Sequence, residues 1–237
     1  MKNLVLIHGF LESNTMWDYL NLEKHFNCFR FELPGHGKAK YKPNTTINLS
    51  EVALDFNKWL AKNNIEYFDI LGHSMGGYVA LEMSKNKGFK GKVILLNSNF
   101  WCDSAQKKKD RERVANIVVE NKKLLIETAI PNLFSDKNKY QDEIDSLIQE
   151  ATSIRADAIA AASISMKNRQ DHSETVRQLS YRLLFVQGEL DKIMPKSVSI
   201  KQIGNMEIAY ECISNAGHMC HVEATNETQQ VIIDFLN

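Results

Sequence analysis

The chain has 237 residues, 43% of them hydrophobic and 24% charged, which suits one globular domain carrying an inserted segment. Lysine plus arginine and aspartate plus glutamate each number 29, so no net field attracts nucleic acid or an anionic membrane, and a small molecule is the expected partner. The four cysteines show no C-x-x-C spacing, which indicates neither a zinc site nor a disulfide framework.

Six apolar runs of strand length alternate with helical patterns along the chain. They cover residues 4–7, 28–33, 67–71, 93–96, 183–186 and 208–213. Such alternation predicts an α/β fold with a mostly parallel sheet of about six strands and helices on both faces. The first run is too short for a signal-peptide core or a membrane span, so we expect a cytoplasmic protein.

The segment after the second run carries an amphipathic pattern. Leu49, Val52, Phe56 and Leu60 follow the spacing of a helix with one apolar face. Asn48 and Glu51 stand where a capping box would begin that helix.

The third run leads directly into the sequence G-H-S-M-G-G at residues 72–77. In the pattern G-x-S-x-G, a strand turns sharply into a helix, and the flanking glycines remove Cβ atoms that would clash. Ser74 is therefore predicted to be an exposed nucleophile at the carboxyl edge of the sheet. The amide of Met75, at the start of the helix, would point toward negative charge developing on a substrate oxygen.

The strand pattern is interrupted between residues 100 and 180, where several helical stretches occur, including an alanine-rich one at 151–166. We expect a helical cap inserted after the fourth strand. The predicted division is a core of residues 1–99 and 181–237 with a cap at 100–180.

A carboxylate is needed to orient the base that activates a serine. Asp191 follows the fifth run in the sequence G-E-L-D, at the edge of the sheet where Ser74 emerges, and it is the predicted acid. Glu189 and Asp103 remain alternatives.

The base is predicted to be His218, which lies in a loop between the last strand-like run and the final helix. His221, three residues later, is the alternative. His8 and His36 flank glycines and are expected to hold loop shape. His73 points away from its neighbour Ser74, because adjacent strand residues face opposite sides.

The loop His8-Gly9-Phe10 after the first strand is predicted to supply the second oxyanion donor. Glycine there lets the backbone approach a substrate, and the Phe10 amide would pair with that of Met75. No cofactor and no metal are required by this set of groups.

With these pieces placed, the chain resembles the α/β-hydrolase superfamily over nearly all its length. The matching segments are L-I-H-G-F at 6–10, E-L-P-G-H-G at 32–37, the elbow at 72–77, G-E-L-D at 188–191, and the histidine loop at 217–223. The family commonly has aspartate where Glu32 stands, a difference that leaves the catalytic assignments unchanged.

The resemblance implies acyl-transfer hydrolysis, with Ser74 attacking a carbonyl, His218 moving the proton and Asp191 orienting His218. We expect a small capped serine hydrolase that cleaves an ester or thioester. Monomer and dimer both stay open.

A carbon–carbon bond hydrolase or a menaquinone-pathway synthase-like lyase with the same triad is the alternative, and a slow-turnover ligand receptor is a third. The carbon–carbon alternative needs cations inside the cap. Arg155, Lys167 and Arg169 lie in the right region, although the simpler interpretation of each is a solvent-facing helix residue. The family's synthases carry arginine where Tyr78 stands here.

Overall fold

The computed structural model describes residues 1–86 and 88–237. Within them, six strands form one parallel sheet in the order β2-β1-β3-β4-β5-β6. The strands are β1 (Asn3–Ile7), β2 (Asn27–Phe31), β3 (Asp69–His73), β4 (Val93–Leu96), β5 (Leu183–Gly188) and β6 (Ala209–Ile213). The predicted α/β fold with a parallel sheet is confirmed.

Helices follow most of the strands. They are α1 (Leu49–Lys62), α2 (Met75–Ser84), α3 (Ala105–Ala129), α4 (Gln141–Ser153), α5 (Ala156–Lys167), α6 (Ser173–Leu179), α7 (Lys196–Ile203), α8 (Cys220–Glu223) and α9 (Thr225–Leu236). Short 3-10 helices include η1 (Asn14–Leu20) and η3 (Ile130–Leu133).

Alternate residues of each buried strand point to opposite faces of the sheet, so both faces are apolar and both are covered by helices. Along β1, Val5 and Ile7 join one apolar cluster, which also contains side chains of α1 and α2. Leu4 and Leu6 join the other, which contains side chains of η1 and α9. The sheet is thus the buried middle layer of the core.

Helix α1 begins at the predicted place, but its cap differs in detail. The Asn48 side chain accepts a hydrogen bond from the Ser50 amide at 2.9 Å rather than from Glu51. The helix buries Phe56, whose ring meets that of Phe31 edge-on at 4.8 Å.

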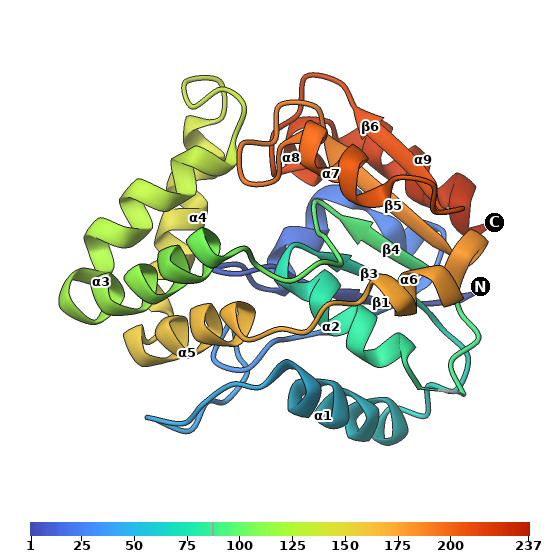
Figure 1. The fold of residues 1–237 in the computed structure, drawn as a ribbon, viewed down its shortest axis with the longest axis horizontal. Coiled ribbons are helices and arrows are strands. Elements are labelled where there is room, and N and C mark those ends of the chain that lie inside the picture. Colours follow the sequence, from blue (N-terminus) through green and yellow to red (C-terminus); the bar gives the residue numbers. More distant parts are fainter. Residues whose placement is uncertain (87) are drawn as a thin grey trace.

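Helices α3, α4 and α5 gather on one side of the sheet (Figure 1) and share a third apolar cluster. Helix α5 also contributes Ala162 and Met166 to the cluster that contains Val5 and Ile7, whereas the buried apolar residues of α6, Val176 and Leu179, belong to that cluster alone. We therefore propose that α3 to α5 form the cap and that α6 returns the chain to the core.

Candidate active site

Ser74 occupies the turn between β3 and α2 with φ 48° and ψ −114°, a conformation that costs free energy for a residue with a side chain. Close packing enforces the turn. A Cβ on Gly76 would lie 2.1 Å from the carbonyl oxygen of Ile7, and one on Gly72 would lie 2.6 Å from the Gly76 backbone. The Ser74 amide donates to the Leu96 carbonyl at 3.0 Å. Because these contacts are all backbone contacts, the partly exposed serine is held rigidly.

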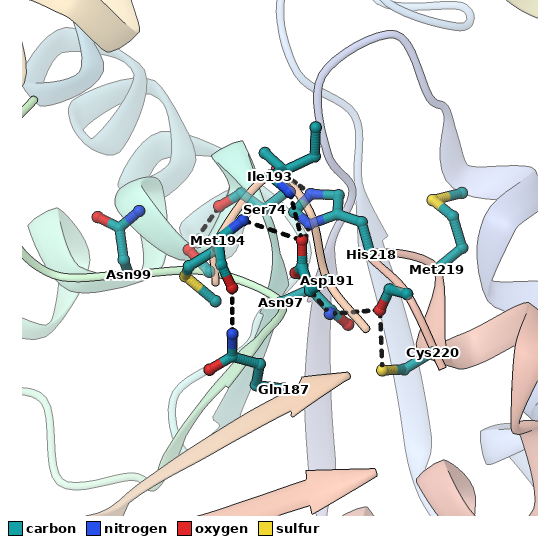
Figure 2. Close-up of polar contacts among 12 residues, drawn as sticks. Ser74, Asn97, Asn99, Gln187, Asp191, Ile193, Met194, His218, Met219 and Cys220 are labelled. Carbon is teal, nitrogen blue, oxygen red and sulfur yellow. Dashed lines mark hydrogen bonds and ion pairs between the residues drawn. The ribbon is translucent and has the colours of Figure 1, made fainter. Parts of the chain in front are cut away.

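The serine, the histidine and the aspartate predicted from separate segments lie in one hydrogen-bonded chain (Figure 2). His218 Nε2 is 3.1 Å from Ser74 Oγ, and His218 Nδ1 is 2.8 Å from Asp191 Oδ2. Since a carboxylate only accepts, Nδ1 carries the proton and Nε2 is free to accept from the serine hydroxyl. The arrangement can therefore pass a proton from Ser74 to His218.

Asp191 is 3% exposed and has its acceptor positions filled. Oδ1 accepts from the Ile193 and Met194 amides at 2.9 and 3.0 Å, and Oδ2 also accepts from the Asn97 side chain at 3.1 Å. Burial raises the pKa of this carboxyl, but the charge of His218 and these hydrogen bonds outweigh burial and lower it overall. Asp191 is a carboxylate at neutral pH.

The alternative acids lie elsewhere. Asp103 is buried and pairs with Arg169 at 2.7 Å and with Arg111 at 3.3 Å. Glu189 is exposed. Neither has a hydrogen bond to His218 within the described part of the chain.

The predicted oxyanion donors flank the serine. Met75 is the first residue of α2, so its amide is one of those at the helix start that lack an intrahelical acceptor. The loop before Phe10 approaches closely, because a Cβ on Gly9 would lie 3.1 Å from Ser74 Cβ. Among residues 1–86 and 88–237, neither the Phe10 nor the Met75 amide has a hydrogen-bond acceptor.

The loop that carries His218 is held from several sides. The His218 amide donates to the carbonyl of Leu133 in the cap at 2.8 Å. Glu223 accepts from the Gly217 amide and from the amide of cap residue Ser135, each at 2.7 Å. The segment 133–135 and the histidine loop are therefore connected through the His218 amide and through the Glu223 side chain.

The other histidines near the site have structural partners. His8 donates from Nδ1 to the Gly9 carbonyl at 2.8 Å and accepts the Leu33 amide at 3.0 Å, which holds the loop as predicted. His73 turns away from Ser74 and contacts Glu12. His221 is fully buried beside Trp17, and the histidine that contacts the Ser74 hydroxyl is His218 rather than this alternative base.

The three cap cations differ from one another. Arg155 is exposed and pairs with Asp157 at 3.0 Å. Lys167 is half-buried and pairs with Glu112 at 2.8 Å. The interpretation of Arg169 as a solvent-facing residue was wrong.

Arg169 is 7% exposed and lies just after the end of α5. It donates to the carbonyls of Met166 and Trp101, pairs with Asp103, and lies 4.3 Å above the ring of Tyr78. The sequence missed this because Tyr78 and the segment that holds Trp101 and Asp103 lie more than 60 positions away from Arg169.

Comparison with known proteins places this geometry in a family. The model of the alpha/beta hydrolase family matches residues 4–229. The chain belongs to the alpha/beta hydrolase family. It is 26% identical in sequence to a thermophilic esterase from Thermogutta terrifontis, whose structure superposes with a TM-score of 0.90, covering 100% of this chain and 89% of that one.

Two curated relatives of this hydrolase carry different names. A putative esterase/lipase 2 from Mycoplasma genitalium is 23% identical over 257 residues, covering 100% of this chain and 90% of the relative. A putative 2-succinyl-6-hydroxy-2,4-cyclohexadiene-1-carboxylate synthase from Haemophilus influenzae is 32% identical over 117 residues. That second match spans about half of each protein, 47% of both.

The hydrolase has two site residues that sequence reasoning missed. Asn97, after β4, donates its side-chain amide to Asp191 and to the Gly217 carbonyl, each at 3.1 Å. Its φ of 45° is one that asparagine tolerates better than most residues. Glu12, after the oxyanion loop, is buried beneath His73. Neither has a sequence signal, since the side chains that they contact, Asp191 and His73, lie far along the chain.

In the described ranges of this hydrolase, 1–86 and 88–237, no helix has both the length and the apolar character needed to traverse a bilayer.

Proposed function

We propose that this hydrolase cleaves a small ester or thioester through an acyl-enzyme on Ser74. The observation that carries the proposal is the hydrogen-bonded chain from Ser74 through His218 to Asp191. The rigid elbow, with the serine in a strained turn, agrees with a nucleophile that must stay exposed.

In the proposed reaction, Ser74 Oγ attacks the substrate carbonyl while His218 Nε2 takes the hydroxyl proton. Asp191 keeps His218 in the tautomer with Nδ1 protonated and stabilises the imidazolium that forms. The Phe10 and Met75 amides receive the oxyanion, and each such donor contributes on the order of 3 kcal/mol in known hydrolases.

His218 then gives its proton to the leaving alcohol or thiol. A water molecule next attacks the acyl-enzyme, with His218 again taking a proton, and the acid is released as Ser74 regains its hydrogen. The cycle consumes one water and needs no cofactor.

The test is active-site labelling with a fluorophosphonate, followed by peptide mapping, and hydrolysis of a panel of short esters and thioesters. Label is expected on Ser74 alone, and Ser74→Ala should abolish both labelling and turnover. Ser84→Ala is the matched control, because Ser84 lies in the last turn of the same helix and its hydroxyl donates to the Leu81 carbonyl. Hydrolysis that persists in Ser74→Ala would refute the mechanism. A burst of one equivalent without turnover would indicate a slow-turnover receptor.

The partial likeness to the Haemophilus influenzae protein favours a carbon–carbon bond hydrolase or synthase-like lyase as the second candidate. The substrates of such enzymes carry carboxylates, which need an available cation. Arg169 is a buried cation beside Tyr78 of α2, and Asp103 already neutralises it at 2.7 Å. Comparing kcat/KM for p-nitrophenyl acetate with that for a dicarboxylate carbon–carbon substrate separates the two functions.

A further inference from the structure

A buried carboxylate lies directly beneath the candidate active site. Glu12 is 1% exposed and comes three residues after Gly9. Its Oε2 accepts two hydrogen bonds of 2.7 Å, one from the Gly9 amide and one from His73 Nδ1. This single oxygen therefore joins the oxyanion loop to the residue that precedes the nucleophile.

The ring of His73 faces an acceptor at both nitrogens. Nδ1 meets the Glu12 carboxylate, and Nε2 meets the backbone carbonyl of His218 at 3.0 Å. A backbone carbonyl cannot donate, and neither can Glu12 while it is ionised, so with a Glu12 carboxylate both bonds form only when the ring carries two protons and a positive charge. Burial lowers the pKa of His73, but Glu12 and the His218 carbonyl outweigh burial and raise it overall.

The other buried histidines around Glu12 are neutral, so none of them replaces His73 as the positively charged partner of Glu12. His8 and His221 are fully buried, and burial lowers the pKa of each to about 3. His221 Nε2 is 3.9 Å from Glu12 Oε1, beyond hydrogen-bond reach. His36 is also buried, and burial lowers its pKa. On the other side, the Asp191 carboxylate adds further attraction for a positive His73.

We propose that Glu12 and His73 form a permanently charged pair that positions the catalytic machinery from below. His73 holds the backbone of His218, and Glu12 holds Gly9, whose neighbour Phe10 supplies the oxyanion amide. Both are positioning residues, since neither touches the substrate. The expected kinetic effects rest on the proposed function, whereas the charge on His73 can be measured whether or not the protein hydrolyses an ester.

Glutamine cannot replace Glu12 without loss, because Oε2 accepts hydrogen bonds from both the Gly9 amide and His73 Nδ1. In Glu12→Gln, an oxygen at that place can still accept from Gly9 and from His73 Nδ1. Without the negative charge, however, the buried His73 loses its second proton, and bare Nε2 then faces the His218 carbonyl. If the amide nitrogen takes that place instead, its hydrogens oppose the Gly9 amide. Either orientation leaves one contact repulsive.

The first experiment measures the charge of His73 in the wild-type protein by ¹⁵N NMR of labelled histidines. One assigned ring, His73, should keep both nitrogens protonated from about pH 6 to about pH 9, above the ordinary titration range of histidine. A neutral His73 at about pH 7 would overturn the proposal. This result is independent of catalysis, so it stands even if no ester is hydrolysed.

The second experiment compares Glu12→Gln with a matched control, Glu82→Gln. Glu82 also pairs with a buried histidine, His172 at 3.2 Å, but it lies eight residues along α2 from Ser74. Glu12→Gln should lower kcat and kcat/KM together by on the order of 100-fold, as expected for a misplaced catalytic group. Glu82→Gln should leave both unchanged, and equal kinetics in the two variants would overturn the positioning role.

Glu12→Asp guards against a folding defect. It keeps the negative charge, so it should retain the doubly protonated His73 signal and recover most of kcat. Activity as low in Glu12→Asp as in Glu12→Gln, with His73 still charged, would assign the loss to packing and refute the electrostatic role.

Discussion

Gly76→Ala tests whether contact between α2 and β1 sets the position of the nucleophile. The added Cβ would lie 2.1 Å from the Ile7 carbonyl oxygen and 2.6 Å from that of His8. Both are backbone atoms at the end of β1, so no side chain can rotate away. Raising the shorter contact from 2.1 Å to 3.0 Å needs a separation of about 0.9 Å.

That displacement moves Ser74 and the Met75 amide away from the Phe10 loop. A misplacement of about 1 Å costs on the order of 100-fold in rate. Overpacking of this kind costs about 1–3 kcal/mol of stability, which is about 2–12 °C in Tm for a chain of this size. Because a domain has about 5–15 kcal/mol of stability, the variant should still fold.

The assays are the rate constant of fluorophosphonate labelling and thermal unfolding. Gly88→Ala is the matched control, because among residues 1–86 and 88–237 its Cβ would make just an ordinary van der Waals contact, 3.5 Å from Asn86 Oδ1. Labelling of Gly76→Ala at the wild-type rate, with an unchanged Tm, would show that the helix can shift without disturbing the site. That result would refute the argument that backbone contact positions Ser74.

Three further predictions concern buried polar groups. Burial raises the pKa of Glu12, but the positive charge of His73 outweighs burial, and the pKa falls from its ordinary 4.5 to about 2. The free energy of unfolding should therefore decrease by about 3 kcal/mol as the pH falls from about 4.5 to about 2. Urea unfolding of Glu12→Gln that shows the same acid dependence as the wild type would contradict this. Asn97→Ala removes both donors to Asp191 and Gly217, so stability should fall by about 1–3 kcal/mol and Ser74 labelling should slow; unchanged labelling would exclude a role in holding the acid. Asp103→Asn leaves the buried Arg169 without its counter-charge and should cost about 3–5 kcal/mol in denaturant unfolding, whereas a loss below about 1 kcal/mol would show that Arg169 finds water or another partner.

The sequence alone determined the layered fold and the three residues of the hydrogen-bonded chain. Short apolar runs that alternate with helical patterns are typical of buried parallel strands, and all six recur as strands within a few residues of the predicted bounds. The G-x-S-x-G turn is set by local sterics, so Ser74 could be placed without tertiary information. Asp191 and His218 followed because parallel strands end at one edge, which brings the loops after β5 and β6 to the serine.

Only the tertiary structure decided how those groups are supported. Glu12, Asn97 and Arg169 look like ordinary polar residues in the sequence, because the side chains that they contact lie far away along the chain. Their roles depend on contacts across 61, 94 and 66 positions, to His73, Asp191 and Asp103. Local steric rules act over a few residues and can be predicted from the sequence. A buried charge, in contrast, is stabilised by partners that are far away in the sequence and that only the folded structure brings into contact.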